Sequence, residues 1–147
     1  MELGPALDAR SYACLRSWVR TAVRVELRDP ADPTPTIGGR LLSPEGGYRD
    51  DTSLATRPDV LDFTGDPLTA DLYLVGTPVV ELAHSCDNPY NDVFVRLSQV
   101  DANGRSTNVT DGFVRQTTDS GVVKLTLDAV AHRFPTGSRL RVMVAVT

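Results

Sequence analysis

The stretch DLYLVGTPVVELAHSCDNPYNDVFVRLSQVDANGRSTNVTDGFVRQ, residues 71–116, decides the fold of this chain. It contains runs rich in β-branched and other apolar residues, separated by clusters of Asn, Asp, Pro, Gly and Ser, which is the pattern of strands joined by turns. Asn103-Gly104 stands between two such runs and favours a tight hairpin, because these residues tolerate positive φ. The stretch therefore predicts consecutive antiparallel strands.

The alternation continues on both sides of this stretch. Apolar residues recur at every second position around 72–75, 123–127 and 140–146, and a period of two indicates half-buried antiparallel strands. Phe134-Pro135-Thr136-Gly137 predicts a turn before the last strand, since proline fixes φ at the second position of a turn. From residue 63 onward we therefore expect an all-β domain built as a β-sandwich.

The N-terminal part of the chain predicts two further segments. Residues 1–28 are rich in arginine and approximate a helical face, so we expect either a short basic amphipathic helix or a leader without an evolved role. Residues 29–62 are rich in Pro and Gly, which predicts an extended arm lying over another part of the domain. Within this arm, Ser53–Arg57 permits one helical turn that Asp50 or Asp51 could cap.

Length, charge and cysteine content limit the classes of function. A chain of 147 residues has room for one domain with one ordinary hydrophobic core. A net charge of -4 argues against nucleic-acid binding, and no apolar run of about 18 residues suits a membrane span. Cys14 and Cys86 lack metal-ligand spacing, so we predict free thiols in a reducing compartment, the cytoplasm.

Four motifs follow one another along residues 29–146. They are DPADPTPTIGG (29–39), RPDVLDFTGDPLTADLYLVGTPVVEL (57–82), NDVFVRLSQVDANGRSTNVTDGFVRQ (91–116) and AHRFPTGSRLRVMV (131–144). Together they resemble the C-terminal domain of the X-prolyl dipeptidyl-peptidases and of the cocaine-esterase-like (CocE/NonD) serine hydrolases. An ordered series over this length is far more specific than any single short motif. The segment before residue 29 does not resemble the family's upstream sequence.

The resemblance implies a jelly-roll β-sandwich of the galactose-binding-like type over residues 63–147. In the family this domain packs against an α/β-hydrolase domain that carries the Ser-His-Asp triad, helps to shape the substrate cleft and stabilises the enzyme. The implied family activities are removal of X-Pro dipeptides and hydrolysis of acyl esters or amides. Family members continue past the strand in which this chain stops, so we expect a truncated sandwich whose hydrolase domain is joined in cis or docks in trans.

The resemblance also assigns structural roles to individual side chains. The family's structural motif residues correspond here to Arg57, Asp59, Asp92, Gly104, Asp111, Gly112 and Arg115. Gly112 is expected to permit a special backbone conformation, and Arg115 to pair with a carboxylate.

The residues themselves offer no complete catalytic group, so we predict that the isolated chain is inactive. Ser11-Tyr12 has a faint similarity to the family's nucleophile elbow, but it lacks the flanking glycines and the preceding strand that an elbow needs. His84 and His132 could act as bases in principle. Neither has a paired nucleophile, and we interpret both as structural.

Other candidate sites also have simpler interpretations. Asp87 and Asp92, with the asparagines between them, could bind calcium, but the same residues are expected in a turn, so we predict no metal and no cofactor. Asn108-Val109-Thr110 fits a glycosylation sequon in a chain without a secretory signal. The alternative function is a stand-alone carbohydrate- or protein-binding module. A carbohydrate site would need exposed aromatic residues around a cleft, whereas Tyr73, Tyr90 and Phe113 are scattered.

Overall fold

The computed structural model describes residues 37–39, 44, 46–85 and 90–146 of the chain. The helix expected within residues 1–28 lies outside these ranges, and so do Ser11, Cys14, Cys86 and Asp87. Among the described residues, no helix is long and apolar enough to cross a membrane.

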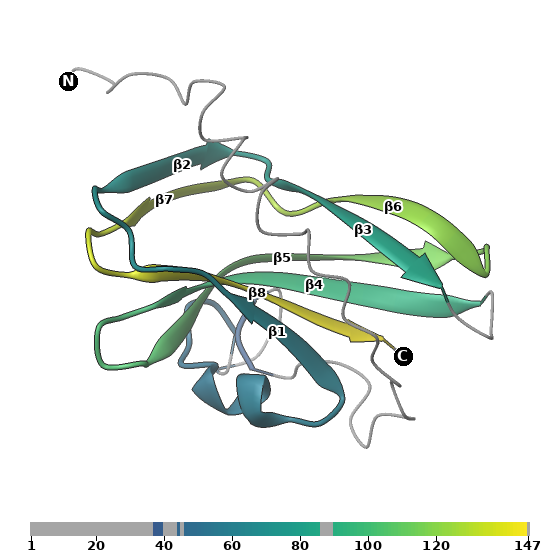
Figure 1. The fold of residues 1–147 in the computed structure, drawn as a ribbon, viewed down its shortest axis with the longest axis horizontal. Helices are drawn as coiled ribbons and strands as arrows, with labels where there is room; N and C mark the ends of the chain where they lie inside the picture. Colours follow the sequence, from purple (N-terminus) through teal and green to yellow (C-terminus); the bar gives the residue numbers. More distant parts are fainter. Residues whose placement is uncertain (1–36, 40–43, 45, 86–89, 147) are drawn as a thin grey trace.

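The described residues form eight strands and one short 3₁₀ helix (Figure 1). Their bounds are η1 Thr52–Thr56, β1 Val60–Thr64, β2 Leu72–Gly76, β3 Val79–Ser85, β4 Asn91–Val100, β5 Ser106–Gln116, β6 Ser120–Thr126, β7 Val130–Phe134 and β8 Arg139–Val146. The all-β prediction is confirmed. The first strand begins at Val60, before the expected residue 63, because β1 pairs with β8 from Val60 opposite Ala145 onward.

The strands are arranged in two layers (Figure 1). One layer is an antiparallel sheet in the order β1-β8-β4-β5, and the other contains the pairs β2-β7 and β3-β6. The pair β2-β7 continues into the pair β3-β6, because Leu127 N donates to Pro78 O at 2.8 Å at the junction between them. The second layer is therefore one long two-stranded ribbon, called the ribbon below. The β-sandwich is confirmed, while the finer jelly-roll assignment stays a prediction.

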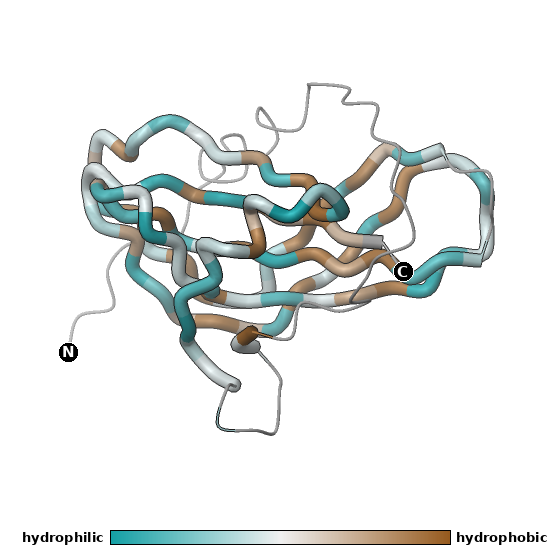
Figure 2. The backbone as a smooth tube through the Cα atoms, turned by 90° about the horizontal axis from the view of Figure 1, so that it is seen from below, coloured by the Kyte–Doolittle hydropathy of each residue, from teal (hydrophilic) through white to brown (hydrophobic). Residues whose placement is uncertain are grey.

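Hydrophobic clusters lie on both faces of the four-stranded sheet. The first fills the space between the sheet and the ribbon and contains Val93, Val95, Leu97, Val109, Val123, Leu125, Leu127, Phe134, Leu140 and Val144. The second lies on the outer face and contains Leu54, Val60, Met143 and Ala145, with Ile37, Ala55 and Phe94 against them. Figure 2 shows hydrophobic and hydrophilic positions alternating along the strands that supply these clusters. The described residues of the arm thus pack against part of the outer face of the sheet.

The hairpin predicted at Asn103-Gly104 joins β4 to β5. Gly104 has φ 86°, whereas no described non-glycine residue has positive φ, Asn103 included. The Asp101 carboxylate accepts hydrogen bonds from Asn103 N at 2.8 Å and Arg105 N at 3.0 Å. The turn therefore depends on one left-handed glycine and on an aspartate that binds the backbone of its own loop.

Gly112 needs to be glycine for a reason that the sequence did not predict. Its φ is not positive, so the expected special backbone conformation at this position is wrong. A Cβ at Gly112 would lie 3.0 Å from Thr126 O and 3.2 Å from a methyl carbon of Leu125. Glycine here lets the ribbon approach the sheet closely.

Gly112→Ala should lower the free energy of unfolding by about 1–3 kcal/mol, because the added methyl overpacks a contact with backbone and core side chains. Chemical denaturation of the purified variant measures this loss. Val122→Ala, an exposed change on the neighbouring β6, should stay within about 0.5 kcal/mol of the parent. Equal stability of the parent and Gly112→Ala would show that the ribbon has room to move away.

Candidate functional site

An arginine buried in the outer face of the sheet is the main polar feature of the described structure. Val93, Val95 and Leu97 of β4 point into the core between the layers. Because side chains alternate along a strand, Arg96 and Ser98 point to the opposite face, beneath the arm. The side chain of Arg96 is only 1% exposed, although it carries a full positive charge.

Arg96 is held by groups from β5 and from the arm. Its Nη2 donates to Asp111 Oδ2 at 3.2 Å, and its Nη1 donates to the carbonyl of Ile37 at 2.5 Å. Asp51 Oδ2 lies 3.8 Å from Nη1 and accepts a hydrogen bond from Ser98 Oγ at 2.7 Å. We call Asp51, Arg96, Ser98 and Asp111 the ion cluster. It ties the arm to the sheet through a backbone carbonyl and a carboxylate.

The ion cluster explains how η1 begins. The helical turn predicted near Ser53–Arg57 is present, and Asp51 occupies its N-cap position without a side-chain capping bond. The neighbouring Asp50 supplies that bond instead, since its Oδ1 accepts from Thr52 N at 3.0 Å. The Asp51 carboxylate is fully buried and turned towards Arg96. Of the two predicted capping residues, Asp50 therefore caps the turn, and Asp51 attaches the turn to the sheet through Arg96 and Ser98.

Asn108 makes a second attachment between arm and sheet. Its Oδ1 accepts from Arg49 N at 2.6 Å, and its Nδ2 donates to Gly47 O at 2.9 Å. Only 3% of Asn108 is exposed. The amide nitrogen that a glycan would need is thus engaged and buried, so this sequon is closed in the folded chain.

The arm approaches the ion cluster so closely that a side chain is excluded at one position. Gly39 has φ 68°, and a Cβ there would lie 2.1 Å from Asp111 Oδ2. Gly39 also bridges to Gly47 within the arm, with Gly39 N donating to Gly47 O at 2.9 Å. Gly39, the last residue of the first sequence motif, therefore lets the backbone of the arm pass close to the Asp111 carboxylate that holds Arg96.

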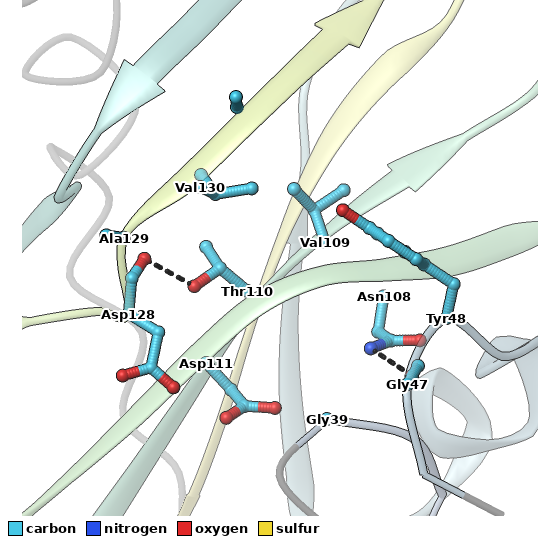
Figure 3. Close-up of a pocket in the computed structure, with 11 residues that line it drawn as sticks. Gly39, Gly47, Tyr48, Asn108, Val109, Thr110, Asp111, Asp128, Ala129 and Val130 are labelled. Carbon is cyan, nitrogen blue, oxygen red and sulfur yellow. Dashed lines mark hydrogen bonds between the residues drawn. The ribbon is translucent and has the colours of Figure 1, made fainter.

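A groove of about 340 Å³ opens beside the ion cluster (Figure 3). It is lined by Gly39, Gly47, Tyr48, Asn108, Val109, Thr110, Asp111, Asp128, Ala129, Val130 and Ala131. This lining has no histidine, cysteine or lysine, and its one hydroxyl on β5, Thr110 Oγ1, donates to Asp128 O at 2.8 Å. Tyr48 is the one aromatic residue among the described residues of the lining, and it is 56% exposed.

Both histidines make structural contacts. His132 packs between Tyr48 and Phe134, with ring centroids 6.2 Å and 4.7 Å away, and its Nε2 lies 2.8 Å from Gln99 Oε1. His84 Nε2 lies 3.4 Å from Thr118 O. The contacts of both rings are thus with backbone, an amide side chain and aromatic side chains. Burial lowers the pKa of His132 below its ordinary value.

The remaining charged residues of the family motif form two ion pairs, one exposed at its arginine and one partly buried. Arg115 faces Asp92 across β4 and β5 and donates to both of its oxygens at 2.8 Å. Arg57 pairs with Asp59 in the same bidentate way. Hydrogen bonds from Arg115 lower the pKa of Asp92, so Arg115 does pair with a carboxylate. The described residues contain no group of three or more acidic, histidine or cysteine side chains that could hold a metal ion.

Breaking the ion cluster should cost far more stability than breaking the surface pair. Arg96→Met should lower the free energy of unfolding by about 3–5 kcal/mol, because two buried carboxylates lose their counter-charge. The matched control, Arg115→Met, removes an arginine whose side chain is 74% exposed and should cost at most about 1 kcal/mol. Denaturation of both variants measures the difference, and similar losses would contradict the role given to Arg96.

His132 should make the domain less stable in mild acid. Its folded-state pKa is lowered, so its contribution is fully present above the unfolded-state pKa near 6.5 and is lost as the pH falls through the folded-state pKa. Thermal midpoints measured between about pH 8 and pH 5 should therefore fall less steeply in His132→Gln than in the parent. Parallel slopes would show that this ring protonates freely in the folded chain.

The chain was compared with known families and proteins. Residues 16–147 match the family described as X-Pro dipeptidyl-peptidase C-terminal non-catalytic domain. This match starts inside the segment 1–28 that was expected to be a leader. A cocaine esterase from Rhodococcus sp. (strain MB1 Bresler) is 35% identical over 103 residues, which are 69% of this chain and 18% of that protein.

Solved structures show the same relationship. An α-amino acid ester hydrolase superposes with a TM-score of 0.62 and 25% identity, over 68% of this chain and 20% of that one. An aminopeptidase from a marine sediment archaeon, Thaumarchaeota archaeon, has a TM-score of 0.62 at 23% identity, over 67% and 20%, and shows the fold alone. The chain thus spans about a fifth of the length of these relatives. It belongs to the family of C-terminal non-catalytic domains of the X-Pro dipeptidyl-peptidase and CocE-type hydrolases.

Proposed function

We propose that this chain serves as the accessory C-terminal domain of a serine α/β-hydrolase, where it helps to shape the substrate cleft and stabilises the catalytic domain. The observation that carries the proposal is the match of residues 16–147 to a domain family described as non-catalytic. The parent enzyme would remove X-Pro dipeptides or hydrolyse acyl esters or amides. The chain itself would bind no metal or cofactor and would be inactive alone.

The arrangement of the polar groups supports this proposal. Acyl transfer needs a nucleophile, a base within hydrogen-bond reach and donors for the developing oxyanion. Asp111, a carboxylate that lines the groove, belongs to the attachment of the arm through its contact with Arg96. The histidines contact an amide, a backbone carbonyl and aromatic rings. A catalytic triad would therefore come from the α/β-hydrolase domain, joined in cis or docked in trans.

Exposed apolar side chains provide surfaces on which a larger domain could pack. Tyr73 and Val75 of β2 are 55% and 71% exposed, and they project from the outer face of the ribbon, because the alternate residues Leu72 and Leu74 pack on the core. Phe113 is 64% exposed on the outer face of β5, opposite Phe94. Side chains of this size commonly become buried where protein surfaces meet. The cytoplasmic location and the absence of nucleic-acid and membrane partners stay predictions.

A domain replacement tests the accessory role. This chain is joined to the Rhodococcus cocaine esterase in place of the esterase's matching C-terminal segment, and the chimera is compared with an esterase that lacks this segment. We expect the chimera to retain more ester hydrolysis and a higher thermal midpoint than the shortened enzyme. A chimera carrying Arg96→Met should lose most of this gain, while Arg115→Met should keep it.

The isolated chain supplies the complementary result. We expect no turnover of chromogenic X-Pro or acyl ester substrates above the uncatalysed rate. Turnover that disappears in Ser11→Ala would overturn the non-catalytic assignment. A chimera no more stable and no more active than the shortened enzyme would contradict the accessory role.

A further inference from the structure

The turn between β4 and β5 exposes an Asn-Gly pair. Val100 and Ser106, at the ends of the two strands, are buried, whereas residues 102–105 between them are exposed. A Cβ built on Gly104 would have no heavy atom within 4 Å. The side-chain amide of Asn103 makes no hydrogen bond with the described residues. The pair is therefore open to water, and no hydrogen bond fixes the Asn103 side chain in one rotamer.

An asparagine that precedes glycine can react with its own backbone. The amide nitrogen of the next residue lies within reach of the side-chain carbonyl carbon, because joining these two atoms closes a five-membered ring. A side chain on the next residue would hinder this approach, and glycine has none. Asn103-Gly104 therefore combines the least hindered neighbour with an exposed turn.

The other asparagines of the chain are less suited to this reaction. Asn88 precedes a proline, whose nitrogen carries no proton to lose. Asn108 precedes a β-branched valine, and both ends of its buried amide are hydrogen-bonded. Asn91 precedes an aspartate and lies in β4. Asn103 is thus the asparagine most open to attack by the backbone.

Asp111-Gly112 is a second pair that could form the same ring, by loss of water from its carboxyl group. The fold opposes the reaction there. Asp111 is only 5% exposed, and its carboxylate accepts a hydrogen bond from Arg96. Gly112 is paired with Val95 inside the sheet. The β4–β5 hairpin therefore contains one exposed pair in its turn and one protected pair in its strand.

Asp101 restrains the exposed pair. Its carboxylate binds the backbone of the loop through Asn103 N and Arg105 N. Its backbone carbonyl accepts a hydrogen bond from Gly104 N at 3.0 Å. The nitrogen that would attack is thus bound within the turn, and it must leave this bond before it can add to the side-chain carbonyl. Removing the Asp101 carboxylate should therefore quicken the attack.

We propose that Asn103 is a site of spontaneous deamidation in the folded chain and that Asp101 sets its rate. Gly104 N loses its proton to water and bonds to Cγ of Asn103. The bond from Cγ to the side-chain nitrogen breaks, and this nitrogen takes up a proton and leaves as ammonia. Water then opens the succinimide at either carbonyl, which leaves aspartate or isoaspartate at position 103. One water is consumed for each ammonia released, and nothing is oxidised or reduced.

The isoaspartate product alters the contacts between the turn and η1. Arg105 Nε donates to Asp50 Oδ2 at 2.9 Å, and Ser106 N donates to Thr52 Oγ1 at 2.9 Å. Isoaspartate adds one carbon to the backbone beside these contacts, and it adds a negative charge to a turn that already contains Asp101. The backbone amides of residues 105 and 106 should therefore exchange faster in the isoaspartate form than in the parent.

Ageing of the full chain at mildly alkaline pH tests this proposal. Trypsin cuts after arginine, so it releases the exposed pair in residues 97–105 and the protected pair in residues 106–115. Mass spectrometry and enzymatic methylation of isoaspartate measure the conversion of each peptide. In the folded chain, residues 97–105 should convert faster than residues 106–115 by about tenfold or more. This ratio should fall in a chain held unfolded in urea, where Asp111 loses its protection.

Two substitutions assign the reaction and its restraint. Asn103→Gln should remove most of the conversion in residues 97–105, because the longer side chain would have to close a six-membered ring. Asp101→Ala should raise the rate in the folded chain by about threefold to tenfold, through the loss of two hydrogen bonds, and should leave the rate in urea unchanged. The matched control, Asp66→Ala, removes an exposed carboxylate outside the turn and should keep the rate of the parent.

The deamidation site would be disproved by a folded chain in which residues 97–105 stay unconverted while they convert in urea. Equal conversion of the two peptides in the folded chain would show that the fold does not distinguish the pairs. An Asp101→Ala chain that ages at the rate of the parent would overturn the role given to Asp101. None of these outcomes bears on the accessory function, which the domain replacement tests separately.

Discussion

The burial of the Arg96 guanidinium is the constraint on which the other features of the outer face depend. Removing an ion from water costs several kcal/mol unless charged and hydrogen-bonding partners replace the solvent. Here the partners come from two places, since Asp111 belongs to the adjacent strand and Asp51 and the Ile37 carbonyl belong to the arm. The arm therefore cannot leave the sheet without leaving the arginine poorly paired. A charged residue in the middle of a strand is thus the attachment point for the described part of the arm.

The second hydrophobic cluster follows from this attachment. With Asp51 fixed over β4, η1 places Leu54 against Met143 and Ala145 of β8, so the middle of the four-stranded sheet is buried on both faces. This explains the nearly continuous burial of Val95, Arg96, Leu97 and Ser98 along β4. Antiparallel sheets commonly leave one face in water. In this domain the arm packs where water would otherwise contact the sheet. The ion cluster supplies the charged and hydrogen-bonding partners of Arg96, which apolar side chains could not supply.

Local patterns were enough to predict the strands, the hairpin at Gly104 and the helical turn after Asp51. They could not predict that Arg96 is buried, because in an alternating strand an arginine beside Val95 normally indicates the solvent face. Its carbonyl partner at Ile37 is 59 residues away, and the Asp51 carboxylate bonds a serine 47 residues away. The need for glycine at 112 depends likewise on Leu125 and Leu127. These features arise from contacts between distant segments, whereas turn and strand signals are local. The sequence could predict that Arg115 pairs with a carboxylate, because its partner, Asp92, lies directly opposite it in the β4–β5 hairpin.

The chemistry of the ion cluster also supports the proposed accessory role. A general base must reach its substrate and exchange a proton with it, but Asp51 is fully buried and Asp111 is held by a permanent cation. Groups used in this way fix one arrangement of arm and sheet. A neighbouring catalytic site gains from a rigid support, since its own groups must be held to within a fraction of an ångström. The ion cluster therefore holds the arm and the sheet in one arrangement. In the proposed function, proton transfer takes place in the hydrolase domain.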